Sequence, residues 1–121
     1  MDDLTDFFKI LSDETRLRIL VLLYHQEYCV CELCGILGES QPKVSKHLAK
    51  LRDLGLVKDV RREQFIYYSL NLVPLFHDIV EKLVYNASDF PVIQKDIQRS
   101  REDRTFLEPC TTKVLQIEPN K

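Results

Sequence analysis

The sequence contains no apolar run near the roughly 20 residues that a membrane-spanning helix requires. Its beginning, Met1-Asp2-Asp3-Leu4, lacks the positive segment typical of a secretory signal peptide. It also has no glycine-rich phosphate loop and no His-Glu-x-x-His motif. We therefore expect a cytoplasmic protein with no membrane partner. We expect that the protein is not an enzyme, because its three histidines lie in separate, apparently helical segments and do not converge on one catalytic site. They are His25, His47 and His77.

The bulk composition is that of a single globular domain. The chain has 121 residues, of which 45% are hydrophobic and 30% are charged. Its net charge of −2 is unevenly spread: residues 1–38 hold 3 Lys or Arg against 7 Asp or Glu, whereas residues 39–63 hold 7 against 4. One basic segment on an acidic body is typical of a protein that contacts phosphate with a limited surface. A solvated charged face without a partner is the alternative.

Apolar residues recur at helical spacing along most of the chain. We expect Ser12 to cap a helix that runs to about Gln26, and Ser40 to cap another with Pro42 in its first turn. Gly38 and Gly55 are suited to the left-handed residue that ends a helix. The predicted helices are 4–11, 13–26, 31–37, 41–54, 73–85 and 91–104.

Two segments rich in β-branched and aromatic residues, 57–60 and 65–70, predict the strands of a hairpin with a charged tip between them. Two strands alone are marginal, so the hairpin must pack on the helices. The predicted fold class is mainly α with a β-hairpin wing (α+β). We expect a winged helix-turn-helix domain over residues 1–105, with terminal helices that make a dimer, and a flexible tail over 106–121.

The predicted helix 41–54 has the pattern expected of a helix that enters DNA. Its inner face holds Val44, Leu48 and Leu51. The opposite face, found by advancing about 100° per residue, carries Lys43, Lys46 and Lys50. A helix fits the major groove and lysines neutralise phosphates. Any amphipathic surface helix has the same pattern, however, so this feature is not decisive alone.

Three of the four cysteines lie close together in Cys29-Val-Cys-Glu-Leu-Cys34. In a reducing compartment, clustered cysteines more often bind metal or do redox chemistry than form structural disulfides. Cys31 and Cys34 point the same way on a helix, but Cys29 joins them only if the preceding chain is extended or the helix start is distorted. Three thiolates suit As(III) or Sb(III), although zinc, cadmium, lead and Cu(I) also favour sulfur. Ordinary buried cysteines are the alternative.

Residues 39–57, 11–20 and 66–70 closely resemble the matching segments of the ArsR/SmtB family of metal-sensing repressors, and the resemblance covers roughly 4–85. It implies a homodimer joined by the first and fifth helices and bound to double-stranded, palindromic operator DNA. The DNA-binding positions it implies, together with the lysine stripe, are Gln41, Lys43, Ser45, Lys46, His47, Lys50, Arg61 and Arg62. A histidine on a helix flank is also commonly an ordinary surface residue.

The wing turn of this family usually carries a glycine. Here Glu63 and Gln64 occupy that region. We therefore expect a loop longer than a two-residue primed turn.

Arsenite-responsive members of the family have Cys-Val-Cys-(Asp/Glu)-Leu-Cys at this place, which implies that Cys29, Cys31 and Cys34 are the ligands. We expect a DNA-binding transcriptional repressor of a metalloid-resistance operon, released by As(III) or Sb(III) as inducer, with no organic cofactor. Cys110 as a further ligand would favour cadmium, lead or zinc, and a thiol redox switch is another alternative. Cadmium and lead sensors of the family have additional N-terminal cysteines, but no cysteine precedes Cys29 here. Zinc-type sensors have paired histidines on the fifth helix, where this sequence has only His77. We therefore interpret His77 as a structural residue.

Overall fold

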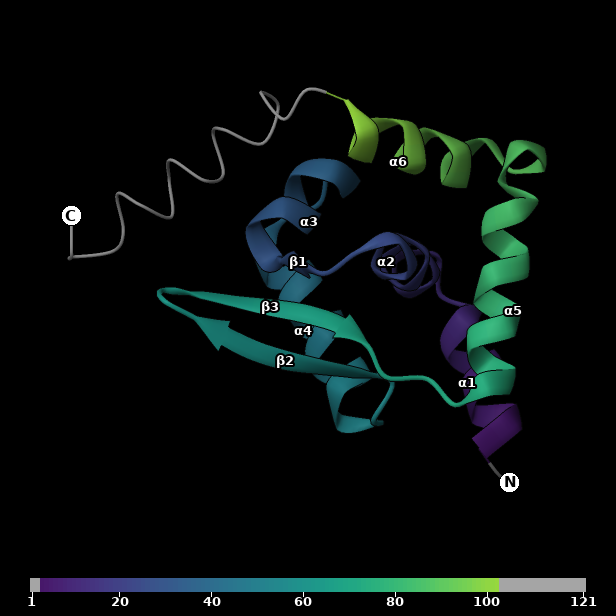
Figure 1. Cartoon of the computed structure of the whole chain (residues 1–121), viewed down its shortest axis with the longest axis horizontal. Helices are drawn as coiled ribbons and strands as arrows, with labels where there is room; N and C mark the ends of the chain where they lie inside the picture. Colours follow the sequence, from purple (N-terminus) through teal and green to yellow (C-terminus); the bar gives the residue numbers. More distant parts are fainter. Residues whose placement is uncertain (1–2, 103–121) are drawn as a thin grey trace.

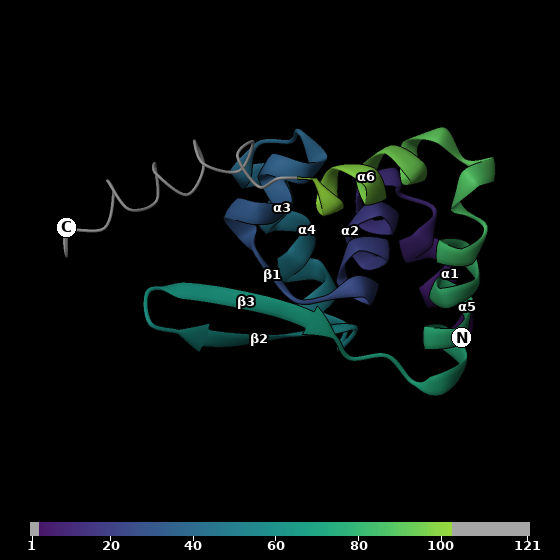
Figure 2. The same cartoon turned by 45° about the horizontal axis from the view of Figure 1, so that its top comes forward.

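A computed structural model describes residues 3–102 of the chain. Within this range the elements are α1 (Asp3–Leu11), α2 (Glu14–His25), β1 (Tyr28–Cys29), α3 (Val30–Leu37), α4 (Gln41–Asp53), β2 (Val57–Arg62), β3 (Phe65–Leu70), α5 (Pro74–Tyr85), a 3₁₀ helix η1 (Ala87–Asp89) and α6 (Pro91–Arg101). The helices gather in one group, and the β2–β3 hairpin projects from it (Figure 1, Figure 2). The predicted fold class, mainly α with a β-hairpin wing, is confirmed. The predicted boundary at 105, the tail and Cys110 lie outside the described residues.

Helix α2 is the centre of the core. Its residues Ile19 to Leu23 are at most 4% exposed, so neighbouring elements cover this helix on every side. On one side, Phe7 of α1 stacks on Phe76 of α5, with ring centroids 4.0 Å apart. Among residues 3–102, no helix has the length and apolar character needed to cross a bilayer.

The cap of α2 differs by one residue from the prediction. The side chain of Asp13, rather than Ser12, accepts a hydrogen bond from the main-chain N–H of Arg16 at 3.0 Å. The Ser12 hydroxyl instead donates to the Lys9 carbonyl at 2.6 Å and closes α1. Asp13 takes the cap because it is the extended residue directly before the helix, which begins at Glu14.

Helices α3 and α4 form the predicted helix-turn-helix. Gly38 ends α3 in the left-handed region, at φ 70°, and its N–H donates to the Cys34 carbonyl at 2.8 Å. The Ser40 hydroxyl caps α4 by accepting from the Lys43 N–H at 3.4 Å. The inner face of α4 is fully buried, as predicted, through Val44, Leu48 and Leu51.

The wing contains two features that the sequence patterns do not indicate. A two-residue strand, β1, pairs antiparallel with β3, so the sheet has the order β1-β3-β2. The expected long loop at the tip is wrong: Arg62 pairs with Phe65, which leaves a two-residue turn. Glu63 takes φ 59° there, and it is the one non-glycine residue with positive φ in the described range. Positive φ at the first loop position alone is the requirement of a type II′ turn, normally met by glycine.

Helix α6 packs across α2 and against α3 (Figure 1, Figure 2). Charged groups hold it there. Arg18 of α2 donates through Nε and Nη2 to the buried Asp96 carboxylate at 2.7 and 2.9 Å. The same Nη2 donates to the Leu37 carbonyl at the end of α3, at 3.0 Å. Arg99 donates to the Gly35 carbonyl at 2.7 Å. The end of α3 is therefore held by both α2 and α6.

Candidate DNA-binding surface and cysteine cluster

The outer face of α4 carries the predicted DNA-binding side chains in the expected arrangement. Gln41, Lys43, Lys46 and Lys50 are exposed, and Ser45 is half-buried. Lys43 Nζ lies 3.1 Å from Glu39 Oε1, one helical turn earlier. Glu39 Oε2 is in turn 3.7 Å from Nη1 of Arg18, the arginine that holds the end of α3. The start of the candidate recognition helix is thus linked by charge to the helices packed behind it.

His47 lies on the flank of α4 that faces the start of α2. Its side chain is 14% exposed, and Nε2 is 4.0 Å from Oδ1 of Asp13. Burial lowers the pKa of this imidazole, which favours the neutral form. The residue lines a hollow beside the helix together with basic residues (Arg16, Lys46, Lys50) and acidic ones (Asp13, Asp53). It is less exposed than the lysines around it.

The two wing arginines are both exposed, but their surroundings differ. Arg61 pairs in register with Ile66, and Arg62 with Phe65. The Arg62 guanidinium donates to both carboxylate oxygens of Glu27, with Nη2 3.0 Å from Oε2. Glu27 directly precedes β1, so this arginine connects the wing tip to the body of the protein.

The cysteine cluster lies where a strand becomes a helix. Cys29 ends β1 and is also the N-cap residue of α3, in an extended conformation with φ −86° and ψ 167°. Its main-chain N–H donates to Oε1 of Glu32 at 3.1 Å. The condition set by the sequence, an extended chain before Cys31, is therefore met. The Glu32 carboxylate thus satisfies a main-chain donor at the start of α3.

The three cysteines differ in accessibility. Cys29 and Cys31 are each 6% exposed, whereas Cys34 is half-buried. Burial raises the pKa of the Cys29 thiol, so it is protonated at neutral pH. A ligand that takes three thiolates therefore requires the Cys29 thiol to give up its proton.

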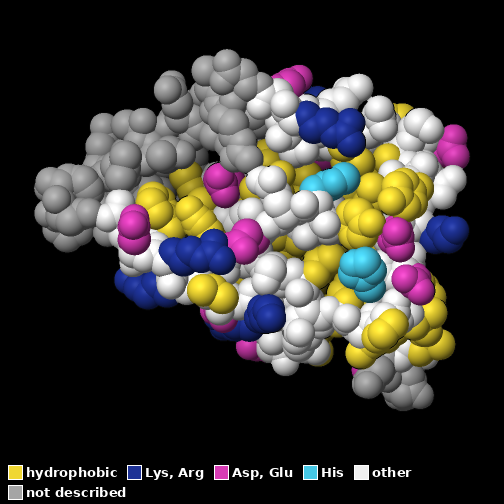
Figure 3. Space-filling model, in the orientation of Figure 1, with side chains coloured by type: hydrophobic (Ala, Val, Ile, Leu, Met, Phe, Trp, Pro, Cys, Tyr) yellow, Lys and Arg dark blue, Asp and Glu magenta, His cyan; other side chains and the backbone are white. Residues whose placement is uncertain are grey.

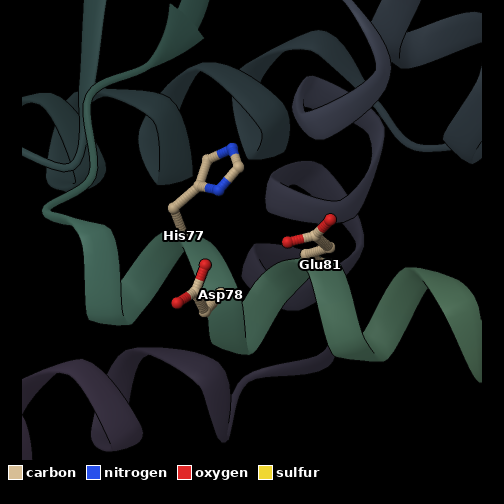
Figure 4. A group of neighbouring side chains, drawn as sticks. All are labelled: His77, Asp78 and Glu81. Atoms are coloured by element: carbon tan, nitrogen blue, oxygen red, sulfur yellow. The ribbon is translucent and has the colours of Figure 1, made fainter.

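A second possible ligand group lies on α5, away from the cysteines. Within residues 3–102, one group of His, Cys, Asp or Glu side chains has ligand atoms that all lie within 4.8 Å of one another, and it consists of His77, Asp78 and Glu81 (Figure 4). All three come from about one turn of a single helix, and two are exposed. The ring of His77 lies 5.4 Å from that of Tyr24. Exposed acidic groups of this kind commonly hold no ion, and the interpretation of His77 as structural stays a prediction.

Helices α1 and α5 lie together and present large hydrophobic side chains to solvent (Figure 1, Figure 3). The residues concerned are 45–71% exposed, and they include Leu4, Phe8, Val73, Leu75 and Tyr85. A set of this size on two adjacent helices is typical of a protein–protein interface.

Comparison with known proteins places this arrangement in a family. Residues 13–59, which span α2, the cysteine cluster, α4 and the start of the wing, match the model of the bacterial regulatory proteins of the arsR family. The structure of HlyU from Vibrio cholerae matches with a TM-score of 0.64 and 32% identity, covering 73% of this chain and 99% of that one. The chain belongs to the arsR family.

Relatives within the family include proteins named for metal or metalloid resistance. An arsenic resistance transcriptional regulator of Pseudomonas putida is 54% identical over 67 residues, 54% of this chain and 58% of the relative. The arsenical resistance operon repressor of Escherichia coli is 52% identical over 65 residues, 53% of this chain and 56% of the relative. A homolog of the cadmium resistance transcriptional regulatory protein of Staphylococcus aureus is 40% identical over 70 residues, covering 57% and 58%. The matched segment is thus less than two thirds of each of these relatives.

Among solved structures, an antimony-specific transcriptional repressor matches with a TM-score of 0.61 and 28% identity, covering 71% of this chain and 80% of that one. Helix α6 and the wing beyond Asp59 lie outside the family match. The family match therefore gives no information about the contacts of α6 and of the wing beyond Asp59.

Proposed function

We propose that this protein is a dimeric, DNA-binding transcriptional repressor. The outer face of α4 supports this reading, because exposed lysines and Gln41 lie on a helix whose other face is fully buried. Such a helix presents donors to base edges and charge to phosphates at the same time. The apolar faces of α1 and α5 would join two copies, and the two recognition helices would then read a palindromic operator.

The inducer we propose is As(III) or Sb(III), bound by Cys29, Cys31 and Cys34. The observation that carries this proposal is the position of Cys29, an extended N-cap residue directly before a helix that holds the other two cysteines. An extended chain allows the first thiol to approach the i, i+3 pair, which a continuous helix would prevent. The relatives named for arsenic and arsenical resistance and the antimony-specific structure support the choice of guest.

Release of DNA follows from the place of this site in the chain. Drawing Cys29 towards Cys31 and Cys34 changes the start of α3, and α3 packs against α4 in the helix-turn-helix. Metalloid binding then disfavours the geometry of α4 that fits the operator. Thermodynamic linkage requires that operator DNA weaken metalloid binding by the same factor, with a typical coupling of about 1–3 kcal/mol.

The test is an operator-release titration with fully reduced protein. Labelled operator is bound, and arsenite, antimonite, cadmium, lead or zinc is added while fluorescence anisotropy is followed. We expect arsenite and antimonite to release the operator at the lowest concentrations. Cys110→Ala and His77→Ala serve as matched variants, and both should behave as the wild type. Release by cadmium, lead or zinc that is lost in Cys110→Ala would favour the four-thiolate reading. Release by zinc that depends on His77 would favour a site on α5.

A thiol redox switch is the second candidate, because Cys34 is half-buried and so within reach of an oxidant. Peroxide titration combined with thiol counting separates the two readings. The metalloid reading predicts release by arsenite with all thiols reduced beforehand. Release by peroxide alone, with no response of the reduced protein to arsenite, would support the redox switch instead.

A further inference from the structure

The exposed Arg62 guanidinium is held by a carboxylate from another part of the chain. Two of its nitrogens donate to the two oxygens of Glu27, a residue 35 positions earlier. The guanidinium carbon also lies 5.2 Å from the ring centre of Tyr67, on the neighbouring strand. Glu27 and Tyr67 together fix the direction in which this wing arginine points.

This paired arrangement occupies the two terminal nitrogens of the Arg62 guanidinium, an edge that a phosphate can also use. Arginine recognises carboxylate and phosphate with the same pair of parallel N–H groups, so only one of these anions binds that edge at a time. A charged Glu27 beside the wing also repels a phosphate that approaches it.

We propose that Glu27 is an internal competitor of operator phosphate for Arg62 and so limits the affinity of the wing for DNA. Glu27 is a positioning residue in this scheme, because it acts through the arginine and does not contact DNA. The inference rests on the proposed function, in which the wing of a repressor approaches the operator backbone.

The same contact ties the wing to the segment that holds the cysteine cluster. Glu27 directly precedes β1, and Cys29, two residues later, pairs in register with Tyr67, whose ring lies under Arg62. The competitor is therefore anchored on the strand that leads into α3, and its distance from the wing depends on the position of that strand. A surface glutamate on a loose loop would compete less effectively, because its own ordering would oppose the contact.

The experiment measures operator affinity without any metalloid, by fluorescence anisotropy over a series of salt concentrations. The proteins are the wild type, Glu27→Gln, Arg62→Gln and the double variant, with Glu63→Gln as the control that removes the same charge from the wing tip and leaves the pair intact. We expect Glu27→Gln to bind the operator about two- to fivefold more tightly, in the range of exposed ion pairs. The slope of log affinity against log salt should steepen by about 0.9 when the released Arg62 neutralises one more phosphate.

The double variant decides whether Arg62 carries the effect. Glu27→Gln should not increase the affinity in the Arg62→Gln background, because this background has no guanidinium for which Glu27 and phosphate could compete. An unchanged or weaker affinity of Glu27→Gln, an equal increase in the Arg62→Gln background, or an equal increase from Glu63→Gln would each overturn the inference. These results leave the proposed function standing as long as the wild type binds the operator. Failure of the wild type to bind would overturn the proposed function, and the inference with it.

Discussion

Cys29 and Tyr67 are paired in the antiparallel ladder between β1 and β3. One residue of the candidate inducer site is thus part of the same sheet as the wing. A guest that moves Cys29 acts on α3 from one side and on the wing strand from the other. The helix-turn-helix and the wing are therefore expected to respond together, and not one after the other.

The number of protons released on binding should distinguish arsenite from a divalent metal ion. Burial raises the pKa of the Cys29 thiol, so this thiol still carries its proton at neutral pH. Arsenite reacts as As(OH)₃ with three thiols to give three As–S bonds and three waters, and no proton is released. Cd²⁺ displaces a proton from each thiol, and its affinity should rise about tenfold per pH unit for each proton released.

Calorimetry in two buffers of different ionisation enthalpy measures these protons. We expect arsenite binding to be almost independent of the buffer and cadmium binding to depend strongly on it. Uptake of one proton for each of the three thiols would mean that Cys29 was already ionised, which would contradict its raised pKa.

Glu63→Gly should stabilise the protein. Glu63 occupies φ 59°, a conformation that costs a non-glycine residue about 1–2 kcal/mol. Glycine removes this strain but loses about 0.5–1 kcal/mol of chain entropy, so the free energy of unfolding should rise by about 0.5–1 kcal/mol. Urea denaturation measures it. Gln64→Gly, at the adjacent position without positive φ, is the control and should destabilise; equal effects of the two variants would argue against strain at Glu63.

Asp96→Asn should destabilise the protein strongly, because it leaves Arg18 without its main partner. Asp96 is 2% exposed and the Arg18 side chain 13% exposed, so water replaces the lost charge poorly. Breaking a buried ion pair from one side costs about 3–5 kcal/mol, and we expect the lower end here. Urea denaturation gives the value, with the exposed Glu102→Gln as control. A loss below about 1 kcal/mol, typical of surface pairs, would show that α6 is not fastened in this way.

Lys46→Gln should weaken binding equally for operator and unrelated DNA. Lys46 is exposed on the outer face of α4, where a phosphate contact carries little sequence information. The salt slope should decrease by about 0.9 for each phosphate that the variant no longer neutralises. Lys95→Gln, which removes a charge from α6, should leave both affinity and slope unchanged. A similar loss of affinity in the two variants would indicate a general charge effect and no phosphate contact by Lys46.

Much of this fold follows from local sequence patterns. The buried face of α4, the left-handed Gly38 and the cap at Ser40 each depend on residues a few positions apart. Strand β1 has no such pattern, because two residues cannot show a period, and its partner β3 lies about 40 residues later. The expectation of a longer loop at Glu63 is wrong because strand register overrides the preference of that residue for negative φ.

The sequence predicts which residues make up the candidate site, but it does not indicate the long-range contacts around that site. The spacing of the cysteines indicates that Cys29 needs an extended chain, and the structure has one. The contacts Glu27–Arg62 and Arg18–Asp96 join segments far apart in sequence, so no local pattern indicates them. The first contact holds the wing and the second holds α6, and both are known only from the three-dimensional structure.

The proposal that arsenite releases the operator by binding the cysteine cluster is tested by one comparison. Operator release by arsenite is measured for the reduced wild type and for a Cys31→Ser, Cys34→Ser variant. Both proteins should bind the labelled operator with similar affinity, because neither side chain lies on the outer face of α4. Arsenite should lower the anisotropy of the wild-type complex and leave that of the variant unchanged. Release of the operator from the variant at the same arsenite concentration would contradict the proposal.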